Sequence, residues 1–567
     1  MKKRSLPVMV VLAATLATLP SGRATAASGD DWPMYGRNNQ RTAFNANEQS
    51  INRTSVALLR PKWFFHTNAG VTASPAAINA FDTYCPGKPR KAVFVGSADG
   101  IFYALDATTT SLTGSVLWQT PADEEDLSSN YGVFASSPFV DVSRKQIYVG
   151  GGFALYAFDL CDGHKLWKWS TKDLGRGEVE SSPLVLERSG GGIVYFGSDL
   201  DGTITNGGSG EFFPAIYAVS ADTGQLGWYW RPSFSTYNGN TGSRICGDVW
   251  SSISTDVVAS EDGLLYFGTA DCGSGNQGNW NEGIVAIDVD PPPGTCSVNP
   301  CQRLDSPNWF YQPHPGDVLD RDFGSTPMLF ESCQKLDGTV VPHCLGVGGK
   351  DGTMYVLDRS ADRDTSGNVT RNGVVRTPLW SVPVTQGGFA AGFIASQATD
   401  GKRIYGATAL FDDSGKNAPV QPPFMHAFNV KDNPASLGRV VGGDSAGTIA
   451  WQQITTGPSF AATTAIDGVI FVGGLVPTIQ ALDANTGQVL WVSPTIGSIA
   501  SGPAISAGEV FVGSGISVQG LGEQPLQGVH AFTLDVPVAA QEMLPPPLPP
   551  MPWPFGVIGP PIFTSQP

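Results

Sequence analysis

The stretch IQALDANTGQVLW, from Ile479 to Trp491, contains the pattern that decides the fold. Apolar and polar residues alternate at its start, as in a strand with one buried face. The Asp, Asn and Gly residues that follow favour a tight turn, and a second short apolar run ends at the tryptophan. The stretch therefore predicts a β-hairpin closed by a large aromatic ring.

This hairpin is one of eight related segments. The matching first strands begin at Ile101, Ala154, Ala215, Gly283, Thr353, Phe424, Thr478 and Gly528. Each follows an apolar strand that ends near glycine, which in turn follows a run of small residues. The closing tryptophans are Trp63, Trp118, Trp167, Trp228, Trp309, Trp380, Trp451 and Trp491. Four short strands repeated roughly every sixty residues are typical of a β-propeller.

The ends of the repeat indicate how the ring closes. Trp63 precedes any complete unit, whereas the last unit has no tryptophan directly after GVHAFTL. An N-terminal strand PKWFFHT that completes the last sheet resolves both facts. We therefore predict an all-β, eight-bladed β-propeller with Trp-closed blades, closed by the N-terminal strand, in which each tryptophan fills the space between neighbouring blades.

The two termini differ from the repeats. Residues 1–26 contain MKKR, an apolar stretch and Ala24-Thr25-Ala26, a pattern that predicts a cleaved signal peptide, with an uncleaved anchor as the alternative. No later run is apolar enough to cross a membrane. We expect the propeller over residues 27–536, a proline-rich tail over residues 537–567, and a periplasmic or secreted protein.

Charge and cysteine usage narrow the possible partners. The formal net charge of −16 argues against nucleic acid and anionic lipid as partners. None of the eight cysteines lies in a C-x-x-C-H haem site, and export makes disulfides the expected state. Loops on a shared face of the ring predict the pairs Cys85–Cys161, Cys246–Cys272, Cys296–Cys301 and Cys333–Cys344.

Topology also sorts the polar residues. If the strands of a blade are A to D from the axis outward, the B–C turns and the D–A links share one face, here called the top face. The unusual polar residues expected there are Glu211, Trp250, Asp271, Asp320, Asp322 and Lys350. Converging carboxylates repel one another, and a bound Ca²⁺ would resolve this repulsion. Alternatively, the three aspartates are ordinary turn residues.

With these motifs the sequence resembles the quinoprotein alcohol dehydrogenases, which bind pyrroloquinoline quinone (PQQ) and Ca²⁺ at the axis of an eight-bladed propeller. The resemblance begins at Asp31 with DWPMYGRNNQRTAFN and includes DVWSS, YFGTAD, DRDFGSTP and GGKDGTMYVLDR. The stretch SQATDGKRIYGAT is most similar to the polyvinyl alcohol dehydrogenase branch. The resemblance implies oxidation of an alcohol, with electrons passed to an external acceptor such as a c-type cytochrome.

The resemblance also implies a role for each site residue. The implied Ca²⁺ ligands are Glu211, Asp271 and Asp320, and Asp320 is the implied catalytic base. The implied cofactor contacts are Trp250, which stacks on the quinone, and Lys350, which bonds its oxygens. Arg176 and Arg244 are candidates to face the cofactor carboxylates.

Several positions depart from the family pattern. No adjacent pair of cysteines is present, Leu319 and Arg321 flank Asp320 where the family often has aromatic residues, and the blade-six stretch GGFAAGFIASQ lacks large polar side chains. A non-catalytic scaffold propeller is therefore the second hypothesis. A lyase or glycosidase with paired carboxylates is a third, which leaves Trp250 and Lys350 unexplained. We predict the enzyme, because a scaffold needs no cluster of acids and a lysine at one rim.

Overall fold

The computed structural model describes most of the ring. The described residues are 29–127, 132–174, 177–199, 215–232, 247–257, 263–270, 280–296, 300–315, 320–362, 374–375, 377–388, 390–409, 411–412, 418–419, 422–432, 444–454, 457–494, 496–516 and 526–535. The predicted signal peptide and proline-rich tail lie outside these ranges. Within them, no helix is both long and apolar enough to cross a membrane.

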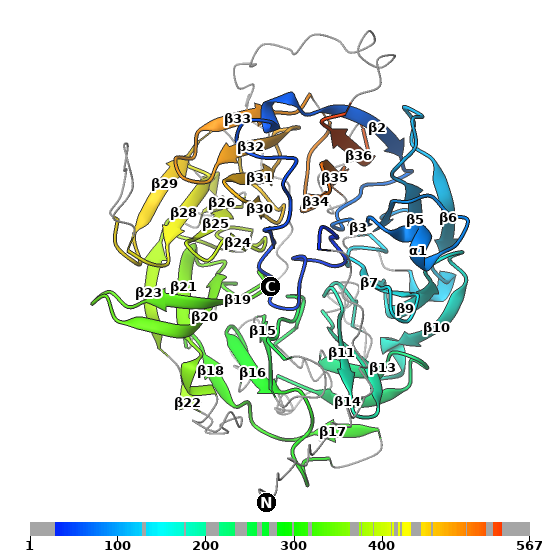
Figure 1. Cartoon of the computed structure of the whole chain (residues 1–567). Coiled ribbons are helices and arrows are strands. Elements are labelled where there is room, and N and C mark those ends of the chain that lie inside the picture. The colour runs from blue at the N-terminus through cyan, green and yellow to red at the C-terminus, as the bar shows by residue number, and fades with distance from the viewer. Residues whose placement is uncertain are drawn as a thin grey trace, which may run out of the picture.

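Eight antiparallel sheets stand around a central axis (Figure 1), which confirms the predicted all-β propeller. Blades 1 to 4 consist of β3 (Ala76–Ile78), β4 (Ala92–Gly96), β5 (Ile101–Asp106) and β6 (Val116–Pro121); β7 (Phe139–Asp141), β8 (Gln146–Gly151), β9 (Ala154–Asp159) and β10 (Lys165–Ser170); β11 (Leu184–Arg188), β12 (Gly191–Gly197), β13 (Ile216–Ser220) and β14 (Leu226–Trp230); and β15 (Leu264–Gly268), β16 (Ile284–Asp288) and β18 (Trp309–Tyr311). The Ser254–Tyr266 bridge marks the innermost strand of blade 4.

Blades 5 to 8 repeat the arrangement. They consist of β19 (Met328–Gln334), β20 (Val340–Gly348), β21 (Thr353–Asp358) and β23 (Pro378–Pro383); β24 (Ala398–Thr399), β25 (Arg403–Ala407), β28 (Met425–Asn429) and β29 (Ile449–Gln453); β30 (Thr464–Ile466), β31 (Val469–Gly473), β32 (Ile479–Asp483) and β33 (Val489–Val492); and β34 (Ala504–Ser506), β35 (Glu509–Ser514), β36 (Gly528–Thr533) and β2 (Arg60–His66). Since β2 pairs antiparallel with β36, the N-terminal strand closes the ring as predicted.

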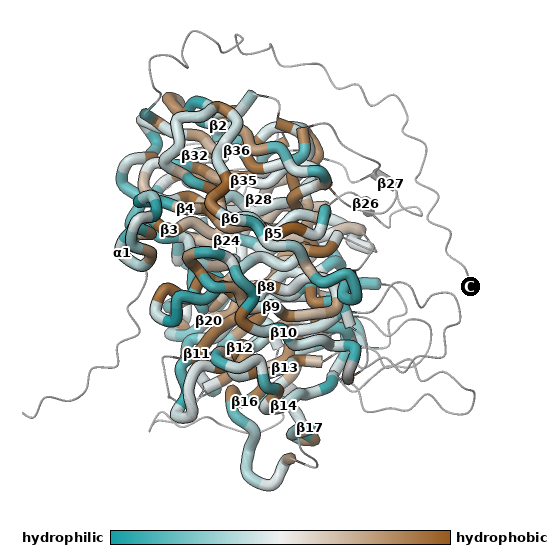
Figure 2. The backbone as a smooth tube through the Cα atoms, turned by 90° about the vertical axis from the view of Figure 1, so that its right-hand side faces the viewer, coloured by the Kyte–Doolittle hydropathy of each residue, from teal (hydrophilic) through white to brown (hydrophobic). Residues whose placement is uncertain are grey.

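Short elements decorate the blades. Three strands add in parallel: β1 (Phe44–Asn45) to β30, β17 (Cys301–Arg303) to β14, and β22 (Val374–Val375) to β18. The pair β26 (Phe411–Asp412) and β27 (Ala418–Pro419) belongs to the B–C connection of blade 6, and α1 (Phe81–Tyr84) to the A–B connection of blade 1. Figure 2 shows α1 and the β26–β27 pair on opposite sides of the ring, as the assignment of connections to two faces requires.

The closing tryptophans bridge neighbouring blades. The indole Nε1 of Trp118 in blade 1 donates to the carbonyl of Leu160 in blade 2 at 3.2 Å. Gly163, in the turn of blade 2, lies against the same ring, since a Cβ there would stand 2.3 Å from the indole, and its φ is +77°. Trp167 and Gly224 repeat this contact one blade further on. The glycine turn of one blade and the closing tryptophan of the blade before it are therefore one packing unit, which confirms the predicted role for Trp118 and Trp167.

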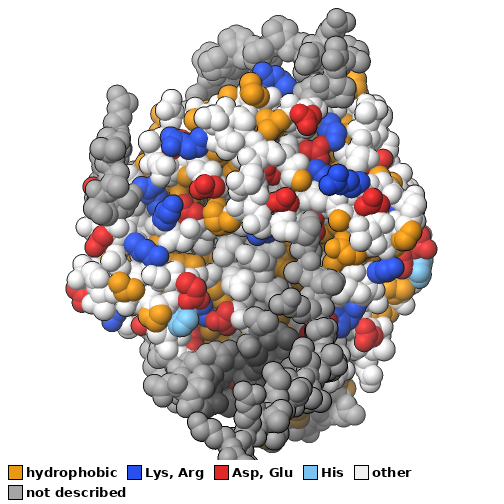
Figure 3. Space-filling model, viewed as in Figure 1, with side chains coloured by type: hydrophobic (Ala, Val, Ile, Leu, Met, Phe, Trp, Pro, Cys, Tyr) orange, Lys and Arg blue, Asp and Glu red, His pale blue; other side chains and the backbone are white. Residues whose placement is uncertain are grey.

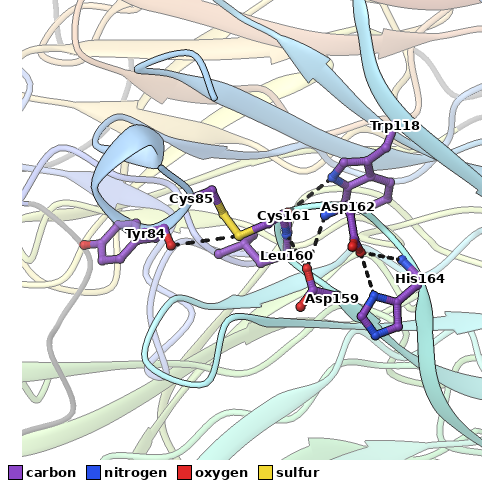
Figure 4. Close-up of a disulfide and its surroundings, with 8 residues drawn as sticks. All are labelled: Tyr84, Cys85, Trp118, Asp159, Leu160, Cys161, Asp162 and His164. Atoms are coloured by element: carbon purple, nitrogen blue, oxygen red, sulfur yellow. Dashed lines mark hydrogen bonds and ion pairs between the residues drawn. A yellow bond between two sulfur atoms is a disulfide. The ribbon is translucent and has the colours of Figure 1, made fainter. Parts of the chain in front are cut away.

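Three of the four predicted disulfides are present. They are Cys85–Cys161, Cys296–Cys301 and Cys333–Cys344. Figure 4 shows that Cys85 follows α1 and meets Cys161 in the turn of the next blade, beside Trp118. Cys246 and Cys272 lie outside the described residues. The first disulfide therefore ties blade 1 covalently to blade 2.

The opening motif of the chain forms an axial cap, residues 31–45, which crosses the middle of the ring (dark blue in Figure 1). It bonds to the innermost segments of all eight blades, and apart from Arg41 its residues follow the order of the blades around the ring. The partners are Trp32 with Ala77, Pro33 with Val140, Arg41 with Ser182 and Pro183, Asn39 with Thr255, Gln40 with Leu329, Thr42 with Thr399, Ala43 with Ala465 and Asn45 with Ile505. The cap therefore closes the bottom end of the axis, opposite the predicted site.

Over its described residues, the bottom face shows no gathering of one charge. Figure 3 shows basic and acidic side chains interspersed over the described part of that face. Some form local pairs, such as Arg144 with Asp141 at 2.9 Å. The described side chains of this face therefore give no sign of a steering field for a charged partner.

Candidate functional site

Eight equivalent positions border the top end of the axis. A chain of hydroxyls defines them: the backbone N–H of Ser137 donates to Ser182, that of Ser182 to Ser252, and that of Ser252 to Thr326, each across one blade boundary. In each blade, the residue two positions before this hydroxyl, or before the equivalent residue, lies at the top end of the axis. These residues are Thr72, Ala135, Glu180, Trp250, Gly324, Ile394, Phe460 and Ala500. All but Gly324 are partly exposed, so they form a ring at the rim, here called the axial ring.

Trp250 lies flat in this ring because its neighbour is glycine. A Cβ on Gly324 would stand 1.6 Å from Cη2 of the Trp250 indole. The indole Nε1 donates to Oδ2 of Asp322 at 3.3 Å. The blade-4 tryptophan therefore leans over blade 5, fixed at one edge by a carboxylate and supported by bare backbone.

Lys350 links the predicted residues of blade 5. Its Nζ lies 2.8 Å from Oδ1 of Asp320, 2.9 Å from Oδ1 of Asp322 and 4.9 Å from the Trp250 ring centroid. Burial by itself would lower the pKa of Lys350, but Asp322 and Asp320 outweigh burial and hold this pKa above its ordinary value. The ammonium is therefore charged, and the two carboxylates leave the group with a net negative charge.

Glu180 is a site residue that the sequence analysis missed. It holds in blade 3 the axial-ring position that Trp250 holds in blade 4, and its buried Oε1 has no hydrogen-bond partner among the described residues. Burial, then Asp199 and Glu178, raise the pKa of Glu180 well above its ordinary value, while Lys350 opposes them. Aligning EVESSP with DVWSSI would have revealed this residue, because the two stretches occupy the same place in the repeat.

The glycine-rich stretch of blade six has a packing role. Gly392, with φ +61°, lies so close to the turn after β20 that a Cβ would stand 2.4 Å from the carbonyl oxygen of Lys350. Gly387, with φ +73°, has a similar contact with Lys350 and Asp351. Positions 387 and 392 carry no side chain because this segment clamps the turn that carries Lys350.

The structure thus brings together Trp250, Asp320, Asp322 and Lys350, the four predicted residues that it describes. The alternative that the aspartates are ordinary turn residues does not account for Asp320 and Asp322, because both carboxylates bind Lys350 at the axis. Glu211, Asp271, Arg176 and Arg244 lie outside the described residues, as does Leu319. The arrangement offers a flat aromatic face, a fixed ammonium and several acidic side chains at one end of the axis.

Comparison with known proteins agrees with this geometry. The family model described as glucose/ethanol/alcohol dehydrogenase, β-propeller domain, matches residues 32–364, and that of the outer membrane protein assembly factor BamB matches residues 437–534. Polyvinylalcohol dehydrogenase of Pseudomonas sp. is 23% identical over 519 residues, covering 86% of this chain and 73% of that protein. Quinohemoprotein alcohol dehydrogenase of Comamonas testosteroni is 23% identical over 569 residues, covering 85% and 72%.

Solved structures show the same fold. The Comamonas testosteroni enzyme and a europium-containing methanol dehydrogenase each superpose with a TM-score of 0.60 at 18% identity. They cover 90% and 89% of this chain, and 82% and 98% of their own chains are matched. Because the dehydrogenase family model spans more than half of the sequence, the chain belongs to the PQQ-dependent alcohol dehydrogenase family and is an oxidoreductase.

Proposed function

We propose that the protein oxidises an alcohol at the top end of its axis, with PQQ as redox cofactor and Ca²⁺ as the metal ion. The observation that carries this proposal is the meeting of Trp250, Asp320 and Lys350 at one point. A binding scaffold has no need to desolvate a lysine between two aspartates beside a flat aromatic ring.

The residues present fit such a ligand pair. Asp199 and Glu178 interact electrostatically with Glu180, and so does Lys350. Lys350 also binds Asp320 and Asp322. This excess of carboxylates is the donor chemistry that a hard cation prefers. Oε1 of Glu180, which has no hydrogen-bond partner within the described part of the chain, and the face of Trp250 supply a polar and a flat contact for a planar, multiply substituted ring.

We assign the individual roles as follows. Glu211, Asp271 and Asp320 bind the cation, while Trp250, Lys350, Arg176 and Arg244 contact PQQ. For the residues outside the described ranges, the support is the sequence motif and the family membership. For the others, the support is the geometry around Lys350.

The protein's part in the chemistry is to hold and deprotonate the alcohol. When bound, PQQ supplies a two-electron acceptor and the cation supplies Lewis-acid polarisation. Lys350 fixes Oδ1 of Asp320, so that Oδ2, which has no hydrogen-bond partner within the described contacts, is the atom available to take the hydroxyl proton. The ammonium also stands where it can stabilise negative charge that develops beside Trp250.

Substrate, acceptor and location follow from weaker signals. The 23% identity to a polyvinylalcohol dehydrogenase supports a secondary or polymeric alcohol. An external acceptor such as a c-type cytochrome is needed because the sequence has no C-x-x-C-H haem motif. The signal-peptide pattern and the three disulfides support a periplasmic or secreted protein.

Reconstitution tests this proposal. Purified protein is titrated with PQQ in the presence of Ca²⁺, or of a lanthanide in a parallel series, and cofactor uptake is followed by tryptophan fluorescence. Dye-linked oxidation of propan-2-ol, ethanol and polyvinyl alcohol is then measured. We expect uptake and turnover to require the metal ion; a protein that takes up no PQQ with any of these ions would instead be a scaffold.

A further inference from the structure

The chain of hydroxyls next to the axial ring is interrupted at two blades. In blade 5 the backbone N–H of Thr326 donates to the hydroxyl of Ser396 in blade 6 at 2.9 Å, as in the contacts between the preceding blades. The equivalent residues of blades 7 and 8 are Ala462 and Gly502, which have no hydroxyl. The backbone N–H of Ser396 therefore has no hydroxyl in blade 7 to which it can donate.

A cavity lies at this interruption, between the axial cap (Figure 1) and the innermost segments of the blades. The volume open to the centre of a water-sized sphere is about 10 Å³, which is room for one water molecule or one monatomic ion of similar size. The residues of its wall that matter here are Tyr35 and Arg41 of the cap, and Ser396, Ala462, Thr463 and Gly502 of the blades.

Arg41 brings a buried positive charge to this cavity. Four of its five N–H groups donate to backbone carbonyls, which leaves one N–H of Nη1 without an acceptor among the described residues. Burial lowers the pKa of Arg41 to about 10, against an opposing effect of Tyr35, so the guanidinium is still charged at neutral pH. No carboxylate is among the described residues that line the cavity. The wall therefore supplies a cation but no counter-ion.

Thr463 adds a second donor. Its side chain is fully buried, and its Oγ1 has no hydrogen-bond partner among the described residues. The neighbouring Thr464 differs in this respect, because its hydroxyl donates to the carbonyl of Pro503 at 2.6 Å. Burying a hydroxyl without a partner is unfavourable, so a ligand in the cavity that accepts the Thr463 proton would be stabilised there.

We propose that this axial cavity binds one small inorganic anion, a monatomic halide such as chloride. The donors are the remaining N–H of Arg41, the hydroxyl of Thr463 and the backbone N–H of Ser396. A water molecule has two lone pairs and no charge, so it neither accepts from all three donors nor balances the guanidinium. A halide does both, in a wall of low polarity where charge interactions are strong. The assignment is independent of the proposed function, because the cavity lies on the cap side of the axial ring.

Urea denaturation tests the binding. Chloride replaces gluconate at constant ionic strength, and we expect the urea midpoint of the wild type to rise with chloride, because a ligand that binds only the folded state stabilises it. Thr463→Val should weaken chloride binding about 10- to 100-fold, since a hydrogen bond to a charged group is lost. Thr255→Val is the matched control. Thr255 is also fully buried, but it lies in blade 4 and its hydroxyl donates to the carbonyl of Leu264 at 2.7 Å, so this variant should respond to chloride as the wild type does.

A second variant fills the cavity without removing a contact. Ala462→Ser restores in blade 7 the hydroxyl that the equivalent residues of blades 1 to 6 carry. This hydroxyl should accept the N–H of Ser396 and take the room of the ion. We therefore expect Ala462→Ser to be at least as stable as the wild type in gluconate and to gain nothing from chloride. Each variant is compared with the wild type in the same salts, because the general effect of a salt on stability is common to all of them.

Long-wavelength anomalous scattering from a crystal grown in chloride identifies the species in the cavity. We expect an anomalous peak between Arg41 and Thr463, and no such peak in Ala462→Ser. A density without anomalous signal would be a water molecule and would overturn the proposal. It would equally be overturned if the wild type and Ala462→Ser gained the same stability from chloride, or if Thr463→Val bound chloride as tightly as the wild type.

Discussion

Replacing Arg41 with alanine should destabilise the ring by way of its axial cap. The side chain is 2% exposed, and its guanidinium donates to four backbone carbonyls. Nε bonds Ile253 at 2.9 Å, Nη1 bonds Tyr35 at 2.5 Å, and Nη2 bonds Ser182 at 3.2 Å and Pro183 at 3.0 Å. One side chain thus joins the cap to blades 3 and 4.

Two opposing effects set the magnitude. Hydrogen bonds to a charged group contribute about 1.5–3 kcal/mol each, so four of them give about 6 kcal/mol or more. Burial lowers the pKa of Arg41 from 12.5 to about 10, which corresponds to a cost of about 3 kcal/mol. We therefore expect Arg41→Ala to reduce the free energy of unfolding by at least about 3 kcal/mol.

Urea denaturation followed by tryptophan fluorescence measures this effect. The control is Arg53→Ala, because Arg53 is about half exposed where it pairs with Asp483, and such pairs contribute at most about 1 kcal/mol. If Arg41→Ala and the wild type unfold at the same urea concentration, the carbonyl bonds of Arg41 do not hold the cap and this reasoning is wrong.

Three further predictions concern the site. Asp320→Asn should keep PQQ uptake but lower dye-linked turnover by at least about 100-fold, and an active variant would exclude Asp320 as the base. Burial, Asp199 and Glu178 raise the pKa of Glu180 above its ordinary value of 4.5. As pH rises from 4.5, the unfolded chain therefore loses the Glu180 proton while the folded protein still holds it. The stability of the cofactor-free protein should fall over this pH range. In Glu180→Gln, the free energy of unfolding from urea denaturation should fall less steeply with pH, by up to about 1.4 kcal/mol per pH unit. If the variant and the wild type have the same slope, the pKa of Glu180 is not raised. Gly324→Ala should displace the Trp250 indole and weaken PQQ binding in a fluorescence titration. Gly190→Ala is the control, because a Cβ there would meet nothing within 4 Å. If the two variants bind PQQ equally well, Gly324 does not support the Trp250 contact with PQQ.

The repeat could be predicted from the sequence because its determinants are local. Strand alternation recurs in all eight units, and a glycine-containing turn followed by a closing tryptophan recurs in several of them, so the copies reinforce one another. Ring closure could be predicted because the last unit lacks a closing tryptophan and Trp63 precedes the first complete unit. In the structure, the strand that contains Trp63 pairs with the last unit. Three disulfides followed from the faces that this topology assigns to loops.

The cap and part of the site could not be predicted in this way. The cap binds the blades mostly through backbone groups, which leave no side-chain pattern in the sequence. Glu180 gains its role from residues that are distant in the chain, Lys350 among them. In the sequence, the glycines of blade six indicated only that large polar side chains are lacking there. In the structure, they allow close packing on the turn that carries Lys350.

The axial ring divides the top end of the axis into two chemically different halves. Blades 3 to 5 supply Glu180, Trp250 and the glycine that Trp250 covers, whereas blades 6 to 8 supply Ile394, Phe460 and Ala500. Charge and hydrogen bonding can hold a ligand on the first half, while the second can add contact and exclude water. Eight similar blades impose no such asymmetry, so it comes from side chains alone. The polar and charged chemistry of this end of the axis therefore comes from side chains on three neighbouring blades.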